Sequence, residues 1–170
     1  CRELAKAGAK LIVWGRDLEK LEQVKIELGL PVIETVSSDL SDEITVQKKI
    51  KYICSKHNLD GIIHMAASPL NHISVADQKN IQELKKHFEV GVIALQILVN
   101  EMMKNRVNID DGFITAVLTE AVFDAPPANM SAYISSKMAI WGLIKSYAKE
   151  LGPMGIRCNA VSPGLMETPY

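Results

Sequence analysis

A tyrosine and a lysine stand four positions apart in the segment SAYISSK, residues 131–137. On a helix, residues with this spacing lie on one face, so Tyr133 and Lys137 would be neighbours. A phenol beside an ammonium group can act as an acid, because the positive charge stabilises the phenolate and lowers a pKa that is otherwise about 10. The same spacing also fits two ordinary residues of an amphipathic helix, with the lysine in solvent. The rest of the chain decides between these interpretations.

Short apolar segments alternate with longer helical patterns along the chain. Segments rich in β-branched or apolar residues and bounded by Gly, Pro or Asp predict strands at 10–14, 31–36, 61–66, 112–118 and 156–161. Apolar residues at helical spacing predict helices at 18–29, 41–57, about 77–104 and 131–152. Most of these begin at an Asp or Ser, and Gly29 and Gly152 stand at helix ends. This alternation predicts one domain, residues 1–170, with an α/β fold of three layers around a doubly wound parallel sheet.

The composition is that of a globular protein, with 48% hydrophobic and 23% charged residues. The formal net charge of −1 gives no electrostatic reason to expect nucleic acid or an anionic membrane as a partner. The most apolar stretch, VGVIALQILV, is too short to span a bilayer. Three scattered cysteines and four histidines without ligand spacing predict no disulfide and no metal site. We therefore expect a cytoplasmic protein.

Four segments carry a resemblance to a known family. They are GRDLEKLE after the strand at 10–14, SSDLSD after the strand at 31–36, AYISSKMAI with its Tyr-x-x-x-Lys pattern, and GIRCNAVSPGLMETP. A lone Tyr-x-x-x-Lys recurs by chance, but four segments in order and at family spacing are specific. With them, the chain resembles the short-chain dehydrogenase/reductases, Rossmann-type enzymes that pass hydride between NAD(P)H and a carbonyl or alcohol. The resemblance covers essentially all 170 residues.

The beginning departs from the family pattern. In a dinucleotide-binding domain, a strand and a glycine-rich turn precede the first helix, whereas this chain starts inside a helical pattern. That first strand would lie at the centre of the sheet. We therefore expect the first strand to be missing from these 170 residues, with a gap between the strands at 10–14 and 61–66. The substrate lobe that follows the last strand in the family is expected to be missing as well.

The resemblance implies catalytic roles for three side chains. Tyr133 would give a proton to the carbonyl oxygen, Lys137 would lower the pKa of Tyr133 and hold the nicotinamide ribose, and a hydroxyl after the strand at 112–118 would polarise the carbonyl. The family usually has serine at this last position. Alignment from the start of the strand gives Thr119, and counting back from Tyr133 gives Glu120. We favour Thr119, because a carboxylate would repel the electron-rich oxygen of a hydride acceptor.

Two further positions depart from the family. Gly91 stands at a position where the family usually has asparagine. The backbone of that asparagine binds a water of the proton relay. His64 opens the segment HMAAS, where many members read Asn-Asn-Ala-Gly. A lone histidine at the end of a buried strand is more often structural, and we expect that of His64. These departures leave an alternative open. The chain would then be a catalytically impaired family member that serves as a nucleotide-binding or structural partner subunit.

The cofactor prediction rests on the end of the strand at 10–14. Where NAD-preferring enzymes of this fold carry a carboxylate, this chain has Gly15, followed by Arg16. An arginine fork fits a phosphate, so NADP(H) is favoured over NAD(H), with a solvated Arg16 as the alternative. The resemblance implies the other cofactor contacts, which are Asp39 and Leu40 at the adenine, Ala66 and Ala67 at the adenosine, Tyr133 and Lys137 at the ribose, and Pro163, Gly164 and Thr168 at the nicotinamide.

Together these residues predict a reductase of a small-molecule carbonyl, with a 3-oxoacyl thioester as one candidate substrate. Family oligomers form through the helix at 77–104 and the helix that carries Tyr133, so a homodimer or homotetramer is expected. Three apolar residues of the long helix, Leu95, Leu98 and Met102, fit either a dimer interface or an ordinary core face.

Overall fold

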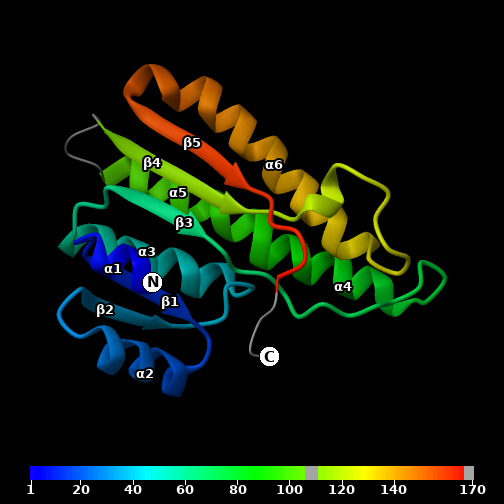
Figure 1. Cartoon of the computed structure of the whole chain (residues 1–170), viewed down its shortest axis with the longest axis horizontal. Helices are drawn as coiled ribbons and strands as arrows, with labels where there is room; N and C mark the ends of the chain where they lie inside the picture. The colour runs from blue at the N-terminus through cyan, green and yellow to red at the C-terminus, as the bar shows by residue number, and fades with distance from the viewer. Residues whose placement is uncertain (106–110, 167–170) are drawn as a thin grey trace.

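The computed structural model describes residues 1–105 and 111–166 (Figure 1). Within these ranges the strands are β1 (Leu11–Gly15), β2 (Val32–Ser37), β3 (Gly61–His64), β4 (Gly112–Val117) and β5 (Ile156–Val161). The α-helices are α1 (Arg2–Lys6), α2 (Leu18–Leu28), α3 (Glu43–Lys56), α4 (Lys79–Phe88), α5 (Ala94–Asn105) and α6 (Ser131–Leu151). The predicted strands and helices are confirmed to within a few residues at their ends.

Side-chain caps fix the beginnings of α2 and α3. The Asp17 carboxylate accepts a hydrogen bond from the backbone N–H of Lys20 at 3.1 Å, and the Asp42 carboxylate accepts one from Thr45 at 3.0 Å. Gly29 then ends α2 with a φ of 63°, a conformation that costs glycine little.

The end of α6 differs from the prediction in its geometry. Gly152 does follow the last helical residue, but its φ is −56°, in the right-handed region. A 3₁₀ turn, η3 (Gly152–Met154), continues the helix, and the left-handed residue is Gly155, with a φ of 78°. Pro153 can start this tighter turn because its missing N–H is not needed there.

The long helix predicted at 77–104 is divided by a π-helical turn. This turn, η1 (Glu89–Ile93), joins α4 to α5, and Gly91 lies at its centre. A Cβ atom added at Gly91 would lie 3.1 Å from Cδ1 of Ile140 on α6, which is closer than most real Cβ contacts. The glycine therefore allows the turn to pass close to α6.

The strands pair in parallel and form two groups. β1 pairs with β2, and β4 lies between β3 and β5. In the described residues no ladder of hydrogen bonds joins β1 to β3, which is where the sequence predicted a gap. Because the strands are parallel, their carboxyl ends lie at one edge of the fold, where the candidate site is built.

Helices α3, α5 and α6 cover one face of the strands. Figure 1 shows α3 and α5 behind the strands and α1 in front of them. The largest buried cluster joins α5, β4, α6 and β5 through the side chains of Leu95, Val99, Met102, Ile114, Ala116, Leu118, Ile140, Ile144, Tyr147, Leu151 and Ile156. This core holds α6, and with it the Tyr-Lys pair, against β4 and β5.

Leu95, Leu98 and Met102 belong to the core and not to an exposed interface. Their exposed fractions are 0%, 9% and 1%. Of the two alternatives left open by the sequence, the core face is the correct one. No helix in the described ranges is long and apolar enough to cross a membrane.

Candidate active site

The end of β4 and the first turn of α6 bring Thr119 and Tyr133 together. Thr119 is extended, and its Oγ1 accepts a hydrogen bond from the N–H of Ala121 at 3.4 Å, which starts the 3₁₀ turn η2 (Glu120–Val122). The Thr119 hydroxyl also lies near the Tyr133 phenol, where it favours the phenolate form. Of the two residues considered for the family's serine position, Thr119 is therefore the one that acts on the phenol.

Glu120 faces a different neighbour. Its backbone N–H donates to the carbonyl of Pro163 at 3.0 Å, and its carboxylate lies over Gly164. A Cβ atom at Gly164 would come within 2.7 Å of the Glu120 Oε2 atom, so a larger residue there would require this exposed carboxylate to move. The backbone hydrogen bond to Pro163 holds the loop after β5 beside the carboxyl end of β4.

Lys137 is buried one helical turn from Tyr133. Its side chain is 4% exposed, and its Nζ donates a hydrogen bond to the Val117 carbonyl at 2.7 Å. Nζ lies 5.7 Å from the centroid of the Tyr133 ring. Burial lowers the pKa of Lys137, because a charged ammonium is less stable away from water.

The pKa of Tyr133 is raised, which corrects the expectation that Lys137 lowers it. Burial of the phenol is the larger cause, and the neighbouring Thr119 hydroxyl opposes it by stabilising the phenolate. Lys137 does not produce the expected lowering in this structure, where its Nζ is bound to the backbone of β4. Thr119 is therefore the group that tunes the phenol here.

Two histidines approach this pair. His64, at the carboxyl end of β3, is 4% exposed, and its pKa falls to about 4 through burial and, to a lesser extent, the charge of Lys137. His87 on α4 packs its ring edge against Tyr133, with centroids 5.8 Å apart. Sequence reasoning missed His87, because one histidine in the polar segment KKHFE gives no signal of its own.

The predicted cofactor residues of the first two strands form a second group. Arg16 follows β1 and Asp39 follows β2, and Nη1 of Arg16 lies 3.8 Å from Oδ2 of Asp39. Asp39 also accepts hydrogen bonds from the N–H and Oγ of Ser41, both at 2.9 Å. The pKa of Asp39 is lowered mainly by the Ser41 backbone bond, with a smaller contribution from Arg16. An exposed guanidinium thus stands beside Gly15, which presents no side chain at the end of β1.

The other predicted cofactor residues lie at the same edge of the strands. Leu40 is half-buried against the core cluster of α3 and β2, Ala66 is half-buried after β3, and Ala67 is exposed. Pro163 is half-buried and Gly164 is exposed in the loop after β5. Thr168 lies outside the described residues.

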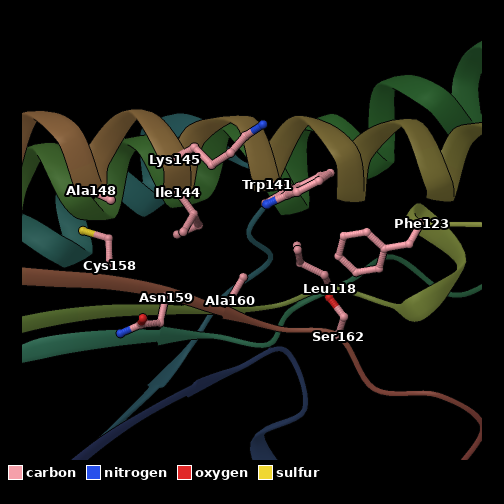
Figure 2. A pocket seen from close by; sticks show the side chains of 10 residues that line it. All are labelled: Leu118, Phe123, Trp141, Ile144, Lys145, Ala148, Cys158, Asn159, Ala160 and Ser162. Carbon is pink, nitrogen blue, oxygen red and sulfur yellow. The ribbon is translucent and has the colours of Figure 1, made fainter.

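An open pocket of about 260 Å³ lies elsewhere, between α6 and β5 (Figure 2). Figure 2 shows Trp141 and Phe123 at one end, with their rings 5.0 Å apart in an edge-to-face arrangement. The pocket is lined by Leu118, Phe123, Trp141, Ile144, Lys145, Ala148, Cys158, Asn159, Ala160 and Ser162, none of which is a predicted site residue. The described residues contain no group of three or more His, Cys, Asp or Glu side chains that could hold a metal ion.

Known proteins resemble this chain in sequence or in fold. Dehydrogenase/reductase SDR family member 6 of Aquarana catesbeiana is 28% identical over 169 residues, which cover 97% of this chain and 64% of that protein. A proposed betaketoacyl-ACP reductase of known structure is 28% identical, with a TM-score of 0.87 and coverage of 99% of this chain and 68% of the other. A metagenomic short-chain oxidoreductase crystallised with NADP is 26% identical, with a TM-score of 0.84 and coverage of 97% and 74%.

The family model for short chain dehydrogenases matches residues 1–170, the whole of the sequence. The order of the four motif segments, the parallel strands and the matched model agree. This chain belongs to the short chain dehydrogenase family.

Proposed function

We propose that this oxidoreductase uses NADP(H) to reduce a carbonyl to an alcohol, with Tyr133 as the acid. The observation that carries the proposal is the closeness of the buried Lys137 ammonium to the Tyr133 ring, 5.7 Å from its centroid, with the Thr119 hydroxyl near the phenol. Bound NADPH would supply the hydride. The Tyr133 hydroxyl would give its proton to the carbonyl oxygen, and the Thr119 hydroxyl would hold that oxygen and then the phenolate. Lys137, one helical turn away, would hold the nicotinamide ribose of the cofactor.

The residues at the ends of β1 and β2 fit a phosphorylated cofactor. Arg16 is half exposed, so its guanidinium can turn toward a 2′-phosphate, and Gly15 leaves room beside it. Asp39 lies next to Arg16 and is held by Ser41, which keeps the arginine near the strand end. The NADP found with the metagenomic relative supports this choice. A 3-oxoacyl thioester is one candidate substrate, supported by the relative proposed to be a betaketoacyl-ACP reductase.

NADPH fluorescence on binding to the full-length protein tests the cofactor. Replacing Arg16 with Ala should weaken NADPH binding about tenfold or more, because a charge-assisted hydrogen bond is lost. Binding of NADH should change much less, since it carries no 2′-phosphate. Arg157→Ala, on the strand at the other side of the fold, is the matched control. Equal losses for NADH and NADPH would contradict a contact to the 2′-phosphate.

Turnover of a simple diketone, 2,3-butanedione, tests the acid. Tyr133→Phe removes the proton donor and should lower kcat by at least about 100-fold. Tyr52→Phe removes the hydroxyl of a half-exposed tyrosine on α3 and should leave kcat unchanged. If NADPH binds without turnover, and Tyr133→Phe does not change its binding, the alternative function as a catalytically impaired partner subunit is favoured. Glycine at position 91, in place of the usual asparagine, is a reason to consider that alternative.

The location in the cytoplasm and the homodimeric or homotetrameric state stay predictions. Sedimentation of the full-length protein would measure the oligomeric state.

A further inference from the structure

Helix α4 buries a histidine where an apolar side chain would be expected. His87 is 3% exposed and is the one buried residue of α4, all of which lies within the described ranges. The apolar residues Ile81 and Leu84 of the same helix are exposed instead. A polar ring between α4 and α6 costs desolvation free energy unless it has a partner there.

The His87 ring contacts the phenol of Tyr133. The two rings meet in a T-shaped arrangement, with centroids 5.8 Å apart and planes at 71°. This geometry lies in the range at which aromatic rings attract each other beyond the effect of burial alone. Lys137 belongs to the same helix as Tyr133, whereas His87 belongs to α4, so the ring contact ties the phenol to a second helix.

Helix α4 is itself fixed beside the first turn of α6. Nδ2 of Asn80 donates hydrogen bonds to the Ser131 hydroxyl and to the Ile73 carbonyl, both at 3.1 Å. Ser131 is the first residue of α6, two positions before Tyr133. His87 therefore stands on a helix whose start is bound to the same turn that carries the phenol.

A carboxylate on the same face of α4 can orient the His87 ring. Glu83 stands about one helical turn before His87, and its Oε2 lies 3.9 Å from Nε2 of His87. This Oε2 is buried and has no hydrogen-bond partner among the described residues, whereas Oε1 accepts a hydrogen bond from Nδ2 of Asn71 at 3.0 Å. An approach of about 1 Å would form an N–H···O bond and satisfy the buried oxygen. Burial lowers the pKa of His87, so at pH 7 the ring is neutral and has one N–H to donate.

We propose that His87 is a positioning residue for the Tyr133 acid, whose imidazole is oriented by Glu83 with the proton on Nε2 and holds the phenol ring for proton transfer to the substrate. The inference rests on the proposed function of Tyr133. It adds a second pair to the site, because Glu83 and His87 act from α4 on a phenol that α6 carries.

The state of the pair is tested without turnover. Long-range ¹H–¹⁵N spectra of the full-length protein at pH 7 should show the His87 ring neutral and protonated on Nε2. Glu83→Leu removes the acceptor, and a second population protonated on Nδ1 should then appear. Any other protonation state of the wild-type ring, or an unchanged ring in Glu83→Leu, would overturn the proposal whether or not the protein reduces carbonyls.

Turnover with NADPH and 2,3-butanedione tests the positioning role. His87→Leu fills the space without a ring and should lower kcat about tenfold, the effect of losing one aromatic contact, with the KM for NADPH changed less than about twofold. His87→Phe keeps an aromatic ring and should restore most of the lost kcat. His57→Phe is the matched control and should leave kcat unchanged. It removes another histidine that faces a carboxylate, since Nε2 of His57 lies 3.0 Å from Oε2 of Glu34.

A double-mutant cycle tests whether Glu83 acts through His87. Glu83→Leu alone should lower kcat about threefold, the effect of losing one weak hydrogen bond. Added to His87→Phe, it should have no further effect, because the phenyl ring has no N–H to orient. The same loss from Glu83→Leu in both backgrounds would show that Glu83 acts independently and would overturn the proposal.

Two other kinetic results would also overturn it, which are equal losses in His87→Leu and His87→Phe and an unchanged kcat in His87→Leu. Failure of the proposed function has a different signature, which is wild-type turnover that Tyr133→Phe does not reduce. Thermal unfolding of each variant gives the temperature below which it is folded, and kcat is compared there.

Discussion

Acid should destabilise this protein through His64, and the size of the effect follows from the pKa of its ring. The unfolded chain binds a proton near pH 6.5, the ordinary value, whereas the folded ring binds one only at about 4. Above pH 6.5 the ring is neutral in both states and contributes no pH dependence. As the pH falls from 6.5 toward 4, only the unfolded state takes up the proton, so the free energy of unfolding decreases. The full effect is about 3 kcal/mol.

Urea unfolding of the wild type and of His64→Gln, at pH 7 and at pH 4.5, measures this effect. The wild type should lose about 2 to 3 kcal/mol more than the variant over this range, because the variant has no ring to protonate. The comparison is needed because burial lowers the pKa of His87 as well, which adds to the acid loss in both proteins. His72→Asn, at an exposed position in the loop after β3, is the control and should behave as the wild type. Parallel pH dependences for the wild type and His64→Gln would refute the reasoning.

Three smaller predictions concern the helices. Asp42→Ala removes the carboxylate that accepts a hydrogen bond from the Thr45 N–H, and it should lower the free energy of unfolding by about 1 kcal/mol. Urea denaturation at pH 7 measures this effect. An unchanged free energy of unfolding would mean that water replaces the cap. Gly142→Ala on α6 should stabilise by up to about 1 kcal/mol, since a Cβ atom there meets nothing within 4 Å. Gly91→Ala should give none of this gain, because its Cβ atom would lie 3.1 Å from buried Ile140; equal gains at both sites would contradict the close contact.

Local features of the sequence were sufficient for the positions of the strands and helices. Apolar periodicity located β1 to β5 and α2 to α6, and Asp17 and Asp42 indicated helix starts because a short carboxylate caps free N–H groups wherever a helix begins. The π turn was not predictable, because a glycine within a helical pattern gives no sign of which neighbour it must avoid. Only the packing of η1 against α6 shows that the neighbour is Ile140.

The pairing of Tyr133 and Lys137 in the candidate site follows from their spacing along the chain. Tyr133 and Lys137 had to share a face of α6, since four residues make about one helical turn. The choice between Thr119 and Glu120 could not be made from spacing alone, because the loop between β4 and α6 sets the register. Folding placed Thr119 on the phenol and Glu120 over Gly164.

The electrostatics of the site were decided by tertiary structure alone. The sequence placed a lysine beside a tyrosine and so suggested a lowered phenol pKa, but burial raises that pKa and Lys137 is bound to Val117. The sequence also suggested that His64 was an ordinary core residue. The fold gives it a free nitrogen beside a buried charge, because β3, η1 and α6 converge there from distant parts of the chain. Spacing fixes which residues are neighbours on one helix, whereas burial and long-range contacts fix their protonation and their partners.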